Sequence, residues 1–291
     1  MPHYIPFLVL IIASVLIFVF TLWNTKDKKL FILLFFMIGL AYVLEYFILV
    51  LFKSYQYNPN FVHETDLDNI LGSLVSQAFA FPVIAVLIGA YQLKFRYIVL
   101  ISFIFMGIEE LFLSLGVYKH YWWKTIYTGI FMTIGFVIAK TWYAWLSNRF
   151  ERWIHIVTLF FSLLAINTTL MLLLIAMFKT HSIHVGWFKS ETRDVLSFNT
   201  LYVWILTALY SWGVLKRSVI MLICFLLTFR IIDVVLLYTG ILILPEWNSL
   251  WFFVLLDIVV ILFTAKYNQF IIHACYGTDS KKFIAFIRNK N

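Results

Sequence analysis

The chain alternates between long apolar runs and short polar segments. Nine of the apolar runs are long enough to cross a bilayer, because about 20 helical residues span a hydrocarbon core of about 30 Å. They are Ile5–Trp23, Leu30–Phe52, Ile70–Tyr91, Tyr97–Val117, Ile126–Trp145, Trp153–Phe178, Leu196–Leu215, Ser218–Leu242 and Leu250–Lys266. The pattern therefore predicts an all-α, polytopic transmembrane helix bundle of about nine spans.

The two ends of the chain carry different signals. No Lys or Arg precedes the first run and no small-residue cleavage pattern follows it, so we interpret this run as a retained helix rather than a signal peptide. Residues 269–291 mix Lys and Arg with Phe and Ile. We expect a basic cytoplasmic tail there, either loose or lying on an anionic leaflet as a short amphipathic helix.

The Lys and Arg residues between the spans predict the orientation. With the N-terminus outside, the inner loops and the tail hold 14 of them and the outer loops hold 6. Because cytoplasmic loops carry an excess of Lys and Arg, this contrast favours an N-outside, C-inside topology.

Similar residues recur along the chain about 124 positions apart. Phe52-Lys53-Ser54 matches Phe178-Lys179-Thr180, and Asp68 matches Asp194; Glu109, Gly116 and Trp123 match Asp233, Gly240 and Trp247. We expect a leading helix with a basic loop (1–29), two tandem four-helix units (30–148 and 149–268) and the tail (269–291). Four helices per unit give both copies one orientation, a parallel repeat. Chance similarity between two apolar stretches is the alternative.

Composition supports the membrane interpretation. The 291 residues are 63% hydrophobic and 12% charged, whereas soluble domains are about 45–50% apolar and about 25% charged. The lipid bilayer is therefore the expected partner. The net charge of +8 does not indicate nucleic-acid binding, because the basic residues lie in short loops and form no continuous patch. Association with further copies or with another membrane chain stays open.

Apart from Lys140 and Lys266, which lie toward the inner ends of their spans and can snorkel, six charged side chains fall inside the predicted spans, where each costs at least about 2.5–3.5 kcal/mol. These candidate ligand or proton sites are Glu45, Glu109, Glu110, Arg230, Asp233 and Asp257. Glu109 and Glu110 lie about 100° apart on a helix, so one is expected to face the bundle interior, and the match to Asp233 favours Glu109. Arg230 and Asp233, three residues apart, can pair on one helix face.

These carboxyls have two interpretations. They can relay protons or bind a cation, or they can hydrogen-bond between helices together with Gln77, Asn167, Thr168 and Thr169. The sequence predicts no cofactor, no catalytic residue and no metal site. His181 and His184 lie in an outer loop without nearby metal-ligand partners.

One stretch resembles a known family. Phe81-Pro82-Val83-Ile84-Ala85-Val86-Leu87, Tyr91, Glu109-Glu110, Tyr118-Lys119 and Trp123 are similar to the CBO0543-type membrane proteins of spore-forming Gram-positive bacteria. The similarity covers roughly residues 45–145 and, more faintly, the second copy, which lacks the Phe-Pro element. The resemblance implies a multi-pass protein of the bacterial plasma membrane and assigns no chemistry.

Three functional classes follow. The first is a non-catalytic envelope scaffold or receptor-type component, since no catalytic constellation is visible. The second is a proton- or cation-coupled small-molecule carrier that uses the buried carboxylates. The third is an intramembrane enzyme, because Ile108-Glu109-Glu110-Leu111-Phe112 locally resembles the Glu-Glu motif of the small-domain lycopene cyclases, although the preceding Pro is absent.

Overall fold

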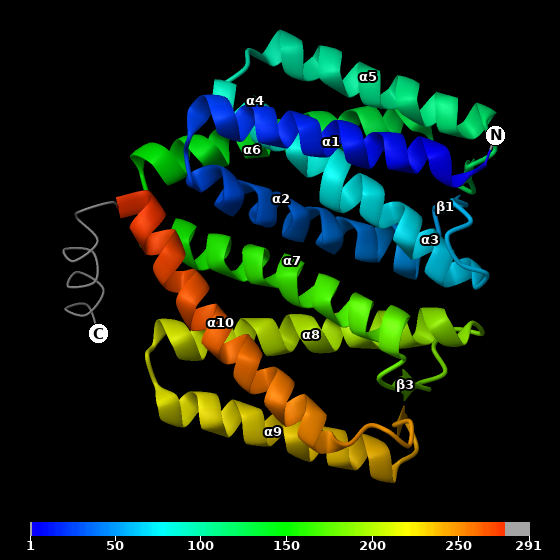
Figure 1. Cartoon of the computed structure of the whole chain (residues 1–291), viewed down its shortest axis with the longest axis vertical. Helices are drawn as coiled ribbons and strands as arrows, with labels where there is room; N and C mark the ends of the chain where they lie inside the picture. Colours follow the sequence, from blue (N-terminus) through cyan, green and yellow to red (C-terminus); the bar gives the residue numbers. More distant parts are fainter. Residues whose placement is uncertain (1, 277–291) are drawn as a thin grey trace. The chain divides into compact units, whose positions relative to one another are not determined.

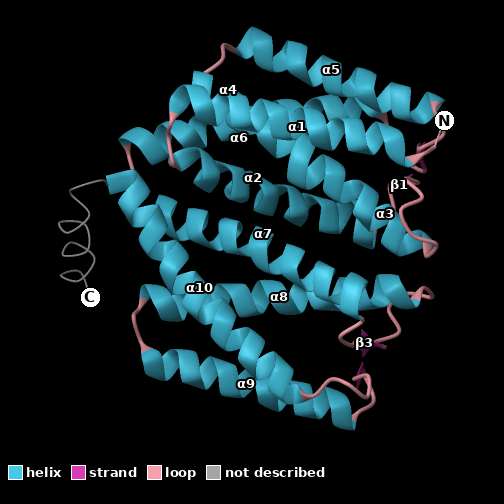
Figure 2. Ribbon diagram, viewed as in Figure 1, coloured by secondary structure: helices cyan, strands magenta, loops and turns pink. Residues whose placement is uncertain are grey.

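The computed structural model describes residues 2–276, and these residues are mostly helical (Figures 1 and 2). The helices are α1 (Tyr4–Thr25), α2 (Lys29–Glu45), α3 (Thr65–Leu74), α4 (Phe81–Tyr91), α5 (Phe95–Ser114), α6 (Thr125–Asn148), α7 (Arg152–Phe178), α8 (Glu191–Leu215), α9 (Val219–Tyr238) and α10 (Leu250–Tyr276). Two π-helical segments continue α2 and α3, namely η1 (Tyr46–Leu51) and η2 (Val75–Ala80). The strands are β1 (Tyr55–Tyr57), β2 (Tyr118–His120), β3 (Ser182–Ile183) and β4 (Leu242–Ile243).

Within this described part of the chain, nine helices are long and apolar enough to cross a membrane, as the hydrophobic pattern predicts. The second span joins α2 to η1, and the third runs continuously through α3, η2 and α4. The prediction of an all-α chain is confirmed at this level. The short strands, which the pattern did not predict, lie in the connections between spans.

Several predicted helix ends are wrong, for local reasons. α8 begins at Glu191 rather than Leu196, because the Ser190 hydroxyl caps it by accepting the Arg193 N–H. α9 ends at Tyr238 rather than Leu242, since Gly240 adopts a left-handed conformation (φ +72°). α10 continues to Tyr276, so residues 269–276 of the predicted tail are helical. The remainder of the predicted basic tail lies outside the described residues.

The chain divides into two compact units, Met1–Ile154 and His155–Asn291. In the first unit α4 packs against α1, α2 and α6, and α5 packs along α6 (Figure 1). Phe36 of α2 stacks on Trp142 of α6 with ring centroids 4.2 Å apart. The leading helix α1 is therefore an integral part of the first unit.

The second unit is built around α8, which contacts both α9 and α10. Polar side chains link its helices in the buried region. Asn167 of α7 donates to the Thr207 hydroxyl of α8 at 2.9 Å, and His155 of α7 lies 2.7 Å from Asn268 Oδ1 of α10. Such bonds satisfy polar groups that lipid cannot.

Each unit ties two of its connections together with a short antiparallel ladder. β1 pairs with β2, and β3 pairs with β4. A carboxylate fixes the loop after the first strand in each case. The Asp68 carboxylate accepts three backbone N–H groups from residues 60–62, and Asp194 accepts four from residues 185–188.

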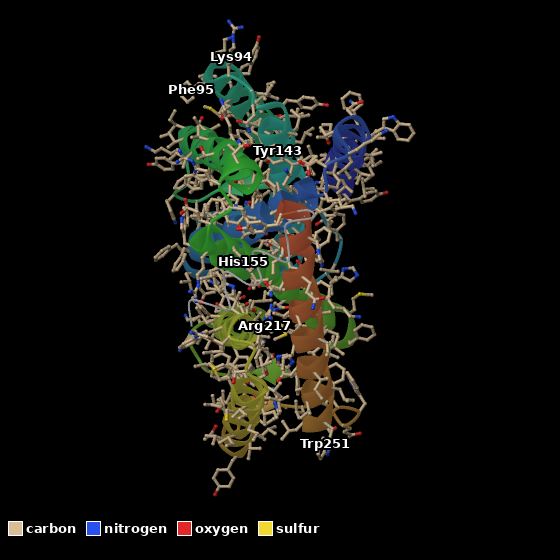
Figure 3. The ribbon with its side chains drawn as sticks, turned by 90° about the vertical axis from the view of Figure 1, so that its left-hand side faces the viewer. Lys94, Phe95, Tyr143, His155, Arg217 and Trp251 are labelled. Carbon is tan, nitrogen blue, oxygen red and sulfur yellow. The ribbon has the colours of Figure 1, made fainter. Side chains whose placement is uncertain are left out.

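Large apolar side chains project outward from the helices of both units. Phe95 at the beginning of α5 is 62% exposed and Trp251 near the beginning of α10 is 75% exposed (Figure 3). Many other large apolar side chains of α1, α5, α9 and α10 are also exposed. Contiguous exposed apolar surface of this kind marks a membrane-facing or protein-facing region.

Replacing Gly89 with valine is expected to destabilise the first unit. A Cβ at this position would lie 2.8 Å from Leu33 Cδ2, 3.2 Å from Tyr143 Cβ and 3.3 Å from the Ala139 carbonyl oxygen. Overpacking of this kind costs about 1–3 kcal/mol, so thermal unfolding in detergent should occur at a lower temperature. Gly107→Val is the matched control, because nothing lies within 4 Å of a Cβ there. If both variants lower the unfolding temperature equally, overpacking at Gly89 is not the cause of the destabilisation.

Candidate functional site

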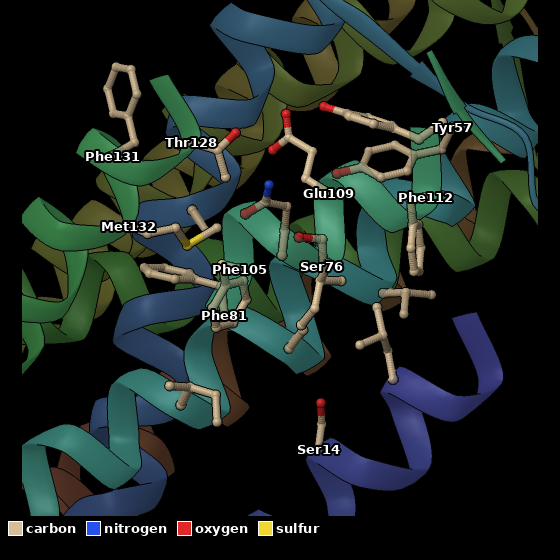
Figure 4. Close-up of a pocket in the computed structure, with 18 of the residues that line it drawn as sticks. Ser14, Tyr57, Ser76, Phe81, Phe105, Glu109, Phe112, Thr128, Phe131 and Met132 are labelled. Carbon is tan, nitrogen blue, oxygen red and sulfur yellow. The ribbon is translucent and has the colours of Figure 1, made fainter. Parts of the chain in front are cut away.

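A cavity of about 380 Å³ lies inside the first unit, bounded by α1, α2, η1, α3, η2, α4, α5, α6 and the strands β1 and β2 (Figure 4). Most of its wall is apolar. Polar groups gather toward one end, where the side chains of Glu109, Tyr57 and Thr128 lie, while Ser14 of α1 lies away from them. The cavity is thus amphipathic, and its volume suits a small molecule.

Glu45 is the buried acid at the polar end, and it is only 7% exposed. Its Oε2 accepts hydrogen bonds from the Tyr55 hydroxyl at 2.5 Å and from Gln77 Nε2 at 3.0 Å. Its Oε1 is buried and no described group lies in hydrogen-bonding geometry to it; the Ser73 hydroxyl, which also interacts with this carboxyl group, donates to the Ile70 carbonyl oxygen at 3.1 Å. Because a buried polar atom without a partner costs about 1–3 kcal/mol, this oxygen points to a missing donor.

Both π-helical segments lie at the cavity. Glu45 is the residue directly before η1, and Gln77 lies within η2. In η2 the Phe81 N–H bonds the Ser76 carbonyl, five residues earlier, next to Pro82, which lacks an N–H. A π turn rotates the side chains that follow it, and such turns are frequent at functional sites. The two segments therefore help to bring Glu45 and Gln77 together.

Glu109 and Glu110 point in different directions, as their helical spacing predicts. The Glu109 side chain is 8% exposed, lines the cavity and lies 2.7 Å from His120 Nε2. Glu110 is exposed, does not line the cavity and accepts a hydrogen bond from the Thr125 hydroxyl at 2.6 Å. The interior carboxylate is therefore Glu109.

Three tyrosines from the β1–β2 ladder close the polar end. Tyr55, Tyr57 and Tyr118 pack with ring centroids 4.7–5.6 Å apart. Tyr57 reaches this position because Gly72 has no Cβ, which would lie 2.5 Å from Tyr57 Cβ. Burial, followed by the nearby Glu45 carboxylate, raises the pKa of the Tyr55 hydroxyl well above its usual range. The tyrosines are therefore protonated hydrogen-bond donors.

The second unit brings together the other predicted charges. Arg230 Nη1 lies 2.8 Å from Asp233 Oδ2, which confirms the expected pair within one helix, and Arg230 Nη2 lies 3.1 Å from Asp257 Oδ2. The Tyr202 hydroxyl donates to Asp233 Oδ1 at 2.7 Å. All three charged side chains are at most 13% exposed. These ion pairs and this hydrogen bond join α8, α9 and α10.

His181 and His184 contact polar side chains of the second unit. His181 Nε2 lies 3.0 Å from Asn199 Oδ1 and its Nδ1 lies 3.0 Å from the Thr180 hydroxyl. Burial lowers the pKa of His181. His184 lies 3.4 Å from Glu191. Within the described residues, no group of three or more His, Cys, Asp and Glu side chains is arranged to hold a metal ion.

Sequence reasoning missed the tyrosines and His120. The alternation Tyr55-Gln56-Tyr57 was a signal for a short strand, and Tyr118 and His120 also alternate about Lys119. Their pairing joins residues more than 60 positions apart, which a single sequence does not reveal.

No family model, no curated protein and no solved structure matches the chain. The resemblance to CBO0543-type proteins therefore stays a prediction.

Replacing Arg230 with methionine is expected to destabilise the second unit by about 3–5 kcal/mol, because it leaves two buried carboxylates without their cation. Thermal unfolding in detergent should show this loss. Adding Asp233→Asn and Asp257→Asn to the same variant should recover much of the stability, since the unpaired charges are then absent. A single variant as stable as the wild type would contradict the ion-pair assignment.

Proposed function

We propose that the protein is a non-catalytic, receptor-type component of a membrane that binds a small amphiphilic molecule in the cavity of the first unit. The apolar wall suits a hydrocarbon portion, and the polar end suits a headgroup. The single observation that carries the proposal is the buried Glu45, whose Oε1 lacks a hydrogen-bond partner among the described residues beside a cavity large enough for a ligand.

We also propose that the chain resides in a bacterial plasma membrane with its N-terminus outside and its C-terminus inside. The distribution of Lys and Arg supports this orientation, because positive residues favour the cytoplasmic side. The CBO0543-type resemblance supports the choice of membrane. Fusions of reporter enzymes to the loops would test the orientation.

A tandem duplication is the proposed origin of the two units. Backbone features recur at the offsets that the sequence matches use. Lys53 and Lys179 have φ of +45° and +46°, and Gly116 and Gly240 have φ of +71° and +72°. Each unit also has an antiparallel ladder, and Asp68 and Asp194 accept loop N–H groups in the same manner.

A proton- or cation-coupled carrier is the second candidate. The contact between Glu109 and His120 favours it, because a carboxylate and an imidazole at a cavity can share a proton. The lycopene-cyclase-like alternative gains no support, since Glu109 and Glu110 do not face a common space.

Ser14→Phe is expected to abolish ligand binding by filling the cavity from α1. Ser14 is 5% exposed and lines the cavity, so the ring must enter the ligand space. Saturable binding of radiolabelled single-chain amphiphiles to the protein in phosphatidylcholine nanodiscs would measure this loss. Val15→Phe is the control, because Val15 is exposed and does not line the cavity. Undiminished binding by a folded Ser14→Phe variant would overturn the proposal.

The carrier alternative has a separate test in proteoliposomes that contain a pH-sensitive dye. A receptor-type protein should give the same internal pH trace as the Glu109→Gln variant when a gradient is imposed. A carrier should acidify the lumen faster than Glu109→Gln, whereas Glu110→Gln should behave as wild type, because Glu110 lies outside the cavity.

A further inference from the structure

The acidic side chains at the polar end of the cavity determine which kind of headgroup fits there. Glu45 and Glu109 both line it, and the described residues of its wall include no Lys, Arg or His. Tyr57 and Tyr118 are each close enough to both carboxylates to interact with them electrostatically. The two acids therefore belong to one polar region, in which the His120 imidazole contacts Glu109 and no basic side chain contacts Glu45 among the described residues.

An anionic headgroup fits this region poorly. Carboxylates in apolar surroundings repel a phosphate or a fatty-acid carboxylate, and no basic side chain of the wall compensates for that repulsion. A neutral headgroup satisfies hydrogen bonds but leaves the Glu45 carboxylate without a counter-charge, whereas Glu109 lies beside His120. A cation lowers the free energy of both carboxylates.

The unpartnered oxygen distinguishes among cations. Glu45 Oε1 requires a hydrogen-bond donor, which a primary ammonium group has and a quaternary ammonium group lacks. An inorganic cation needs several oxygen ligands, and the described residues contain no group of three or more His, Cys, Asp and Glu side chains arranged to hold one. The rings of Tyr55, Tyr57, Tyr118 and Trp123 line the same end and favour an organic cation.

The rest of the wall indicates what is attached to the cation. Leu10, Ala13 and Ile17 of α1 face Ile101, Phe105 and other apolar residues of α5 and α4 across the cavity. Hydrocarbon buried along such a wall is stabilised by about 0.8 kcal/mol for each methylene. A molecule with an amine at one end and an alkyl chain at the other matches both regions.

We infer that the cavity binds a single-chain amphiphile with a protonated primary amine, whose ammonium group donates to Glu45 Oε1 near Glu109 and whose chain lies between α1 and α5. This inference deepens the proposed function and rests on it. It assigns the headgroup to Glu45 and Glu109 and the chain to the apolar wall.

The test is equilibrium binding of radiolabelled dodecylamine to the protein in phosphatidylcholine nanodiscs at neutral pH, with empty nanodiscs as background. Dodecylamine should saturate at one molecule per chain. Unlabelled dodecanol, dodecanoate and dodecyltrimethylammonium should compete at least about tenfold more weakly, because each lacks either the charge or the donor. Lysophosphatidylethanolamine, an amine beside a phosphate, should also compete weakly.

Three variants assign the binding to residues. Glu45→Gln and Glu109→Gln should each weaken dodecylamine binding by about tenfold or more, because each removes a charge-assisted contact. Glu110→Gln should bind as wild type, since its carboxylate lies outside the cavity. Elution as a single species from a sizing column, with unchanged helical content, shows that a variant is folded.

The outcomes separate this inference from the proposed function. Saturable dodecanol or dodecanoate binding that Ser14→Phe abolishes, without preference for dodecylamine, overturns the amine assignment and leaves the receptor proposal standing. Competition by dodecyltrimethylammonium equal to that of dodecylamine overturns the hydrogen-bond assignment to Glu45. Saturable binding of none of the probes overturns both proposals.

Discussion

The structure depends on one constraint: polar groups between apolar helices must find partners within the protein, because lipid supplies none. Arg230 meets it by contacting two aspartates, and Asn167 meets it by donating to Thr207. Outside the spans, Asp68 and Asp194 satisfy backbone groups of two long loops. Several buried side-chain atoms of the described residues have no hydrogen-bond partner, among them Glu45 Oε1, Ser211 Oγ and Arg230 Nε. Of the residues that carry such atoms, Glu45 lines the cavity, so its oxygen indicates where a bound molecule completes the structure.

The two units differ in how their buried acidic side chains are paired with basic ones. The second unit holds two acids and one Arg in direct contact, which makes its cluster a helix-to-helix link. The first unit holds Glu45 and Glu109 at a cavity, with neutral hydroxyl and amide groups around Glu45 and an imidazole beside Glu109. If the units are copies, the surroundings of the matched acids Glu109 and Asp233 have diverged. Asp233 lies beside an Arg, whereas Glu109 does not.

The sequence predicted the helices well because apolar length and period are local properties. It also located charges inside the spans, and it identified Glu109 as the interior member of its pair from helical geometry together with the match to Asp233. It did not reveal that Tyr55 approaches Glu45, because that contact depends on the β1–β2 pairing across two spans. The ends of α8 and α9 were misjudged because a Ser cap and a left-handed Gly override the apolar pattern.

The β1–β2 ladder has a mechanical consequence for the cavity. It joins the connection after η1 to the connection before α6, so the intervening helices are held at both ends by backbone hydrogen bonds. Helix α1 lies outside that closed segment, and its described hydrogen bonds to the rest of the unit are those of His3 with Asn58 and Asn24 with Tyr91. The position of α1 at the cavity wall therefore depends on packing, such as that of Phe7 against Tyr57 and Phe112, rather than on the ladder.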